Sequence, residues 1–144
     1  MIKKFLDKSG YIAINLKKTK SQHLTCILKI NGVKGLFLID TGASNSCINK
    51  NEKEIFNQVD KNLEIEGSGA GKEKLNLKMT QKSTVEYRSR KIGNFSFLLL
   101  DMDHINETML KSGGNAINGI IGADFLKKTK AIICYKPLAF FLKA

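Results

Sequence analysis

The sequence predicts a single, mainly β domain with one to three short helices. Apolar residues alternate with polar ones in several short runs, as at Leu75, Leu77 and Met79, which is typical of strands with one buried face. Asn31-Gly32 separates two such runs and favours a two-residue hairpin turn. A chain of 144 residues is long enough for one hydrophobic core, so residues 1–144 are expected to form one domain.

The same patterns place the elements along the chain. Residues 1–20 are expected to form an N-terminal arm or an extra strand. Strands are predicted over residues 11–16, 24–30, 36–39, 47–48, 63–66, 75–79, 83–87, 91–100, 131–135 and 138–142. Helices are predicted over residues 52–59 with Asn51 as the cap, from a capping Asp103 to Leu110, and from Phe125 onward.

The chain is strongly basic, with 24 Lys and Arg against 13 Asp and Glu and a net charge of +11. Such a charge raises the hypothesis of a nucleic-acid-binding domain. Only Arg88 and Arg90 are arginines, however, whereas proteins that read bases and phosphates depend on the bidentate contacts of Arg. The lysines are therefore interpreted as a solvated surface, and no specific nucleic-acid partner is expected.

The three cysteines, Cys26, Cys47 and Cys134, are far apart and lie in or beside apolar segments. Free buried thiols in a reducing compartment are the expected state. The N-terminal residues lack the apolar region of a secretory signal, and no stretch reaches the length of a membrane span. A cytoplasmic location without membrane attachment is therefore predicted. The acidic cluster at residues 101–104 is judged too small for a metal site, and neither a metal nor a cofactor is expected.

The stretch on which the functional hypothesis depends runs from Gly35 to Ser46 and reads GLFLIDTGASNS. Its apolar residues 36–39 predict a buried strand, and the strand ends directly at Asp40. A buried carboxylate without partners loses its hydration at a high cost. Gly42 allows a tight turn that directs backbone N–H groups toward this acid. A β-turn with a capping Asp is the alternative interpretation.

A second stretch, residues 118–126 (NGIIGADFL), changes this balance. Asp-Thr-Gly at residues 40–42, followed by two hydrophobic residues and Gly at residues 120–122, resembles the two signature elements of the retropepsin-like aspartic proteases. The resemblance covers roughly residues 25–142. It implies a closed, bent β-barrel protomer with a flap hairpin, and an aspartic endopeptidase activity.

The resemblance also assigns roles to individual residues. Asp40 matches the catalytic acid and base, Thr41 the residue that braces the partner loop across a dimer axis, and Gly42 the glycine whose N–H faces the carboxylate. The residues that match the structural part of the motif are Ala43, Ser44, Ile120, Ile121, Gly122 and Asp124. Asp124 is expected to cap or pair near the helix. Because pepsins carry a serine at the position of Ala43, a mildly acidic pH optimum is expected.

One Asp-Thr-Gly loop supplies only half of such an active site, so the resemblance implies a homodimer. Two Asp40 carboxylates in near contact cannot both ionise and would share one proton, an effect well known from aspartic proteases. The ionised acid would activate a water, and the protonated acid would polarise the scissile carbonyl. The expected substrate is a polypeptide with apolar residues at the cleaved bond. Residues 139–142, taken as an unpaired apolar edge strand, are the expected dimer contact.

A glycine cluster, Gly67-Ser68-Gly69-Ala70-Gly71, precedes the alternating run that begins at Leu75. A phosphate-binding loop would need a helix after it, but the period that follows is that of a strand. The cluster is therefore predicted to be the substrate-binding tip of a flap hairpin over residues 64–79. A plain surface hairpin is the alternative.

Two rival functions remain open at this stage. A catalytically silent module of the same fold could bind peptides or proteins without cleaving them. A basic nucleic-acid-binding domain would show an affinity that falls steeply with salt.

Overall fold

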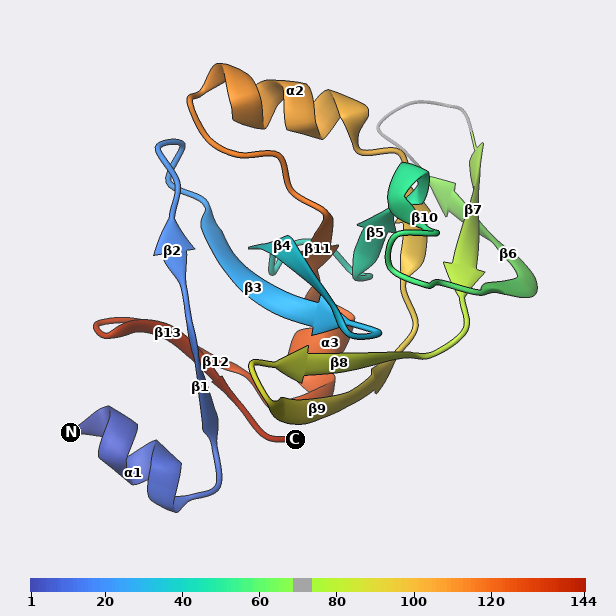
Figure 1. Ribbon diagram of the computed structural model, residues 1–144. Helices are drawn as coiled ribbons and strands as arrows, with labels where there is room; N and C mark the ends of the chain where they lie inside the picture. Colours follow the sequence, from blue (N-terminus) through green and yellow to red (C-terminus); the bar gives the residue numbers. More distant parts are fainter. Residues whose placement is uncertain (69–73) are drawn as a thin grey trace.

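The computed structural model describes residues 1–68 and 74–144, and it describes their side chains outside residues 62–77. In chain order the elements are α1 (Ile2–Lys8), β1 (Ile12–Asn15), β2 (Lys17–Lys18), β3 (Leu24–Ile30), β4 (Val33–Ile39), β5 (Cys47–Asn49), η1 (Lys50–Glu52), β6 (Asp60–Ser68), β7 (Lys74–Thr80), β8 (Ser83–Tyr87), β9 (Arg90–Phe95), β10 (Leu98–Leu100), α2 (Asp103–Lys111), β11 (Gly119–Ile121), α3 (Ala123–Lys128), β12 (Ile132–Tyr135) and β13 (Leu138–Leu142). The chain is mainly β with short helices, as predicted (Figure 1).

The larger sheet holds ten described strands and curls strongly (Figure 1). Strand β4 lies inside this sheet, with β3 antiparallel on one side and β11 parallel on the other. Beyond β11 the order continues through β5, β10, β7 and β6, and beyond β3 it continues through β8 and β9. Strand β4 is therefore held from both sides, and its carboxyl end is fixed by two neighbouring strands.

The hairpin predicted at Asn31-Gly32 is confirmed. These two residues join β3 to β4 with φ values of 49° and 84°. Positive φ at both turn positions suits the right-handed twist of the flanking strands and is tolerated best by Asn and Gly. The turn sets the register of β3 against β4, and with it the place at which β4 ends.

The main core packs inside the curl of the sheet. Its fully buried side chains include Phe37 of β4, Ile121 of β11 and Phe125 of α3. The rings of Phe95 and Phe125 lie with their centroids 4.3 Å apart. Burial of aromatic rings of this size contributes strongly to stability. Strands β4 and β11, which hold Asp40 in place, are therefore packed against a stable core.

The smaller sheet has three described strands in the order β1-β13-β12. Strand β13 therefore lies between two neighbours, and Ala139, Phe140, Phe141 and Leu142 are all buried within one chain. Leu6 of α1 packs against Ala139 and Phe141 on one face of this sheet. The prediction that residues 139–142 form an unpaired edge strand is wrong, because β1 and β12 pair with the two edges of β13.

The predicted helix over residues 52–59 is also wrong. A short 3₁₀ turn occupies Lys50–Glu52, and the side chain of Asn49 accepts a hydrogen bond from the Asn51 N–H at its start. Asn57 then takes a φ of 51°, a left-handed conformation that ends helical geometry. Phe56 is buried while Ile55 and Val59 are exposed. This segment is therefore attached to the core by one aromatic side chain and not by the apolar face of a helix.

Two further boundaries differ from prediction. Residues 91–100 form two strands, β9 and β10, because strand pairing is interrupted at Phe97. The Phe97 N–H donates to the Thr80 hydroxyl, and the Phe97 carbonyl accepts from the Thr80 N–H. Asp103 is the first residue of α2 and not its cap, a position that Met102 occupies. The Asp101 carboxylate, just before it, accepts from the Asp103 N–H at 3.0 Å.

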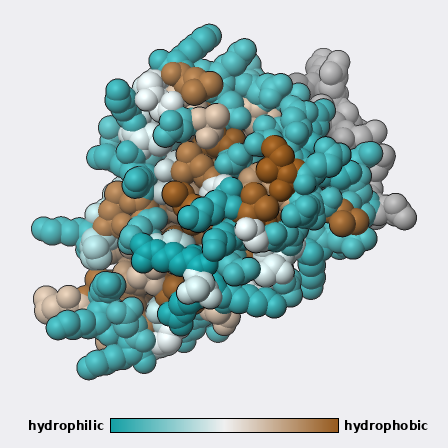
Figure 2. Space-filling view, viewed as in Figure 1, coloured by the Kyte–Doolittle hydropathy of each residue, from teal (hydrophilic) through white to brown (hydrophobic). Residues whose placement is uncertain are grey.

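The N-terminal residues begin with a helix, α1, followed by β1 as the strand predicted over residues 11–16. None of the described helices is long and apolar enough to cross a membrane. On the face seen in Figure 2, apolar side chains form an interrupted patch across the middle, and hydrophilic side chains surround it.

Candidate active site

Asp40 lies at the point where β4 ends, and two backbone contacts fix its position. Its N–H donates to the carbonyl of Ile121 at 3.0 Å, which extends the parallel pairing of β4 with β11 by one residue. Its own carbonyl accepts from the Ala43 N–H at 3.2 Å and closes the following turn. The structure thus brings the two sequence motifs together at Asp40.

Asp40 as a whole residue is half-buried. The Gly42 N–H donates to Asp40 Oδ1 at 3.0 Å. Among the described residues the recorded ion pair joins Lys53 to Asp60, and none involves Asp40. The carboxylate is therefore oriented by its own loop, no cation among the described side chains neutralises it, and it remains available to a second group.

Thr41 and Gly42 form the exposed tip of this loop. Thr41 borders a shallow depression of about 360 Å³, whose other lining residues belong to α3, to the segment after it and to β12. Those residues are Ala123, Leu126, Lys127, Lys130, Ala131 and Ile133. The tip of the loop and a partly apolar surface are therefore continuous in one chain.

Asp124 acts as an anchor between the loop and helix α3. Its Oδ1 accepts hydrogen bonds from the Ser46 N–H at 2.9 Å, the Ser46 hydroxyl at 2.7 Å and the Phe125 N–H at 2.8 Å. Ser46 Oγ in turn accepts from the Gly122 N–H at 2.9 Å. Hydrogen bonds to an ionised group are stronger than those between neutral groups, so this network ties the end of the loop to the start of α3.

Gly122 lies where the chain leaves no space for a side chain. A Cβ on it would lie 2.6 Å from the Ala43 carbonyl oxygen and 3.0 Å from the Asn45 backbone. Across this contact the Ala123 N–H donates to the Ala43 carbonyl at 2.7 Å, and the Asp124 N–H donates to the Ser44 carbonyl at 3.3 Å. Glycine at position 122 is therefore required by close approach of two backbones.

Sequence reasoning missed Ser46 in this network and Asn118 in a separate pair of contacts beside it. Asn118 Oδ1 accepts from the Leu36 N–H at 2.8 Å, and its side-chain N–H donates to Glu52 at 2.9 Å. Both residues lie next to short buried strands, β5 and β11. That position was the available signal, because a polar side chain beside a buried strand needs a partner.

The predicted flap is described only in part. Gly67 and Ser68 belong to β6 and pair with Leu75 and Lys74 of β7 in an antiparallel hairpin. Gly69, Ala70 and Gly71 lie outside the described residues. The role of this hairpin in binding substrate therefore stays a prediction.

Cys47 follows Ser46 directly and is the thiol nearest to this network in sequence. Burial raises the pKa of its thiol to about 11, and the charges of Asp124 and Asp40 act in the same direction, against a hydrogen bond with the Ile120 backbone. The thiol is therefore protonated near neutral pH and is a poor nucleophile. In the part of the chain that the structure describes, no three His, Cys, Asp or Glu side chains gather as metal ligands would.

Residues 27–125 match the aspartyl protease family, a stretch that includes both Asp40 and Asp124. The chain belongs to this family. No curated protein matches the sequence.

Two solved structures resemble the fold of this family member along most of its length. A retropepsin-like aspartic protease from Rickettsia conorii covers 93% of this chain and 91% of its own, with 19% identity and a TM-score of 0.57. The retroviral protease-like domain of Ddi1 from Leishmania major covers 88% of this chain and 96% of its own, with 24% identity and a TM-score of 0.58. The fold is therefore that of a retropepsin-like aspartic protease protomer.

Proposed function

We propose that this chain is an aspartic endopeptidase whose active site forms between the Asp40 carboxylates of two identical chains. The observation that carries the proposal is that the Asp40 carboxylate of a single chain is oriented but has no recorded ion-pair partner. The residue is half-buried, its carboxylate is oriented by the Gly42 N–H, and no ion pair among the described residues neutralises it. Membership of the aspartyl protease family supports the same reaction class.

In the proposed reaction the two Asp40 side chains hold one proton between them. The ionised carboxylate removes a proton from a water, and the resulting hydroxide adds to the scissile carbonyl carbon. The other Asp40 donates its proton to the carbonyl oxygen, which gives a neutral tetrahedral diol. The C–N bond then breaks as the leaving nitrogen takes a proton from one carboxyl group and the carboxylate pair regains a proton from the diol.

Thr41 supports the proposed dimer because it is exposed in the single chain and borders the partly apolar depression at α3 and β12. Exposed apolar surface next to a site that is incomplete in one chain favours association of two copies. We infer that this surface, and not β13, supplies the contact between the two chains.

Replacement of Thr41 by Ala should weaken the dimer without affecting the protomer. Because Thr41 is exposed, its removal should change the free energy of unfolding of the protomer by no more than about 0.5 kcal/mol. Loss of a hydroxyl that hydrogen-bonds in the interface should raise the dimer dissociation constant by about tenfold. Sedimentation equilibrium measures this change. Thr41→Ser, which keeps the hydroxyl, is the matched control, and equal dissociation constants for all three proteins would contradict the interface.

The pH optimum follows from the surroundings of Asp40. Ala43 presents a methyl group where a serine would stabilise the ionised acid, so we expect an optimum in the mildly acidic range. A strongly acidic optimum would contradict this part of the proposal.

Digestion of an unbiased peptide library tests the reaction class directly. The expected result is internal cleavage with apolar residues around the cleaved bond, without a metal or cofactor. A statine-type analogue, which imitates the tetrahedral diol, should block cleavage and raise the melting temperature of the protein. A library left intact at every pH, with no stabilisation by the analogue, would instead favour a peptide-binding module of the same fold.

A further inference from the structure

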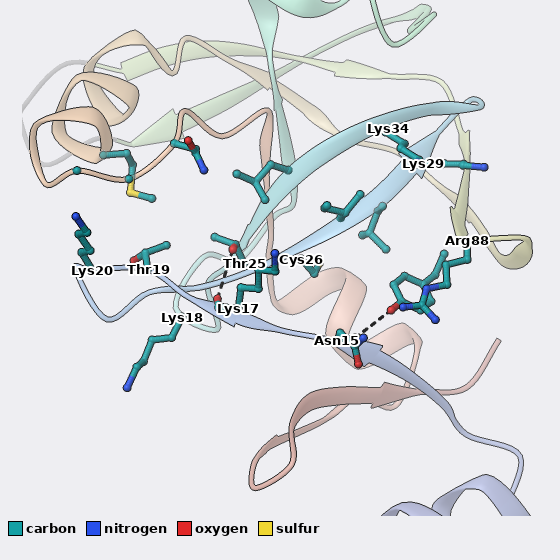
Figure 3. Close-up of a pocket in the computed structure, with 18 of the residues that line it drawn as sticks. Asn15, Lys17, Lys18, Thr19, Lys20, Thr25, Cys26, Lys29, Lys34 and Arg88 are labelled. Carbon is teal, nitrogen blue, oxygen red and sulfur yellow. Dashed lines mark hydrogen bonds between the residues drawn. The ribbon is translucent and has the colours of Figure 1, made fainter.

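A groove of about 890 Å³ runs over the outer face of β3 and β4 and is separate from the Asp40 loop. Its cationic side chains come from β2, the β2–β3 loop, β3, β4 and the turn after β8. They are Lys17, Lys18, Lys20, Lys29, Lys34 and Arg88, and no described residue that lines the groove is acidic. Figure 3 shows Lys20 at one end and Lys29, Lys34 and Arg88 at the other.

The groove floor between these charges is apolar. Ile27 of β3 is 52% exposed, and Leu36 of β4 and Met109 of α2 also line the floor. In the groove wall, the Asn15 N–H donates to the Tyr87 hydroxyl at 3.3 Å and links β1 to β8 (Figure 3). A surface of this kind fits a partner that carries both negative charges and apolar side chains.

Two of the lysines oppose each other directly. Lys29 and Lys34 are register partners in the antiparallel pair of β3 and β4, and like charges at such positions destabilise a sheet. Glu86 of β8 is the partner of Lys29 on the other side, yet among the described residues no ion pair joins the two. An external carboxylate beside Lys29 and Lys34 would relieve their repulsion.

The groove is connected to Asp40 by β4 itself. Lys34 and Leu36 lie in the groove, and β4 continues from them to Ile39, next to Asp40. An extended chain advances about 3.3 Å per residue, so the Lys29–Lys34 pair of the groove lies about six residues of extended peptide away from Asp40. We propose that the groove binds an acidic segment of the polypeptide substrate, with an interspersed apolar residue, at that distance from the cleaved bond.

That the acidic segment belongs to a substrate rests on the proposed protease function. The preference of the groove for an acidic polypeptide rests on the residues of the groove alone. A nucleic acid fits the groove less well. Arg88 is the only arginine among the described lining residues, and the one aromatic residue there, Tyr87, is 9% exposed and offers no ring for base stacking.

Binding is measured first, on the Asp40→Asn protein, so that hydrolysis does not enter the result. The probe is a fluorescent peptide containing Glu-Glu-Ile-Glu, compared with Gln-Gln-Ile-Gln. The Glu peptide should bind at least about tenfold more tightly at low salt, and added salt should reduce the difference. Lys29→Gln with Lys34→Gln should remove most of this preference, whereas the same two changes at Lys3 and Lys4 on α1, outside the groove, should leave it intact.

Hydrolysis is measured next, with peptides that carry the Glu segment about six residues before or after the cleaved bond. One of the two placements should raise kcat/KM over the Gln peptide. The Lys29 and Lys34 variant should lose this gain, whereas the Lys3 and Lys4 variant should keep it. If no peptide is cleaved but the binding preference holds, the protease function fails and the groove assignment stands. Equal binding of Glu and Gln peptides, equal effects of both lysine pairs, or tighter binding of an oligonucleotide than of the Glu peptide would overturn the groove assignment.

Discussion

Replacing Asp40 by Asn should lower kcat/KM for peptide hydrolysis by about 10³-fold or more while leaving the fold unchanged. An amide can neither remove a proton from water nor donate one to a carbonyl at the required pKa, so general acid–base catalysis by this position is lost. The fold should persist because the side-chain oxygen of Asn can still accept the hydrogen bond from the Gly42 N–H that Asp40 Oδ1 accepts at 3.0 Å. Steady-state kinetics together with a thermal melt measures both effects.

Asp101 supplies a matched control for this substitution. Its carboxylate accepts a hydrogen bond from the backbone N–H two residues later, at 3.0 Å, the same local arrangement as in Asp40. Asp101→Asn should therefore leave kcat/KM unchanged. Equal loss of activity in the two variants would mean that the effect of Asp40→Asn is not catalytic.

Replacing Gly122 by Ala should have the largest effect on the loop that holds Asp40. The added Cβ would lie 2.6 Å from the Ala43 carbonyl oxygen, which is backbone and cannot rotate away. Overpacking of this kind costs about 1–3 kcal/mol, and separation of the two segments would also weaken the hydrogen bond from the Ala123 N–H to that carbonyl. We expect lower stability by chemical denaturation and a much lower kcat.

Gly42→Ala is the control for stability in this experiment. A Cβ at position 42 would approach no closer than 3.4 Å to Asp40 Oδ1, which is an ordinary contact, so its free energy of unfolding should change much less. If Gly122→Ala proved as stable as Gly42→Ala, the close approach of the two backbones would not constrain the loop as argued.

The features that local patterns determine could be predicted from the sequence. The strands predicted over residues 83–87 and 138–142 are β8 and β13 with the same bounds, and Asn31-Gly32 marked the β3–β4 hairpin. Two motifs distant in the sequence indicated one family, and the structure pairs β4 with β11 and brings both motifs to Asp40. The helix predicted over residues 52–59 from the spacing of apolar residues is absent. The buried Phe56 and the left-handed backbone of Asn57 determine the conformation of this segment instead.

Features that depend on distant contacts could not be predicted. Nothing local to Ser46 indicates that Asp124, 78 residues later, accepts two of its hydrogen bonds. Likewise, the apolar run at residues 139–142 is compatible with a dimer contact or with a buried central strand. The strand β1 and the helix α1 decide between the two, and the sequence pattern contains no information on where they pack.

The central claim is that one active site needs an Asp40 from each of two chains, and mixed dimers test it most directly. Wild-type and Asp40→Asn chains are unfolded together in equal amounts, refolded, and checked for mixed dimers with two different affinity tags. If each site needs both carboxylates, only dimers of two wild-type chains are active, and random pairing leaves about a quarter of the activity of the same total amount of wild type. Activity of about one half, in proportion to the wild-type share, would contradict a site shared between two chains.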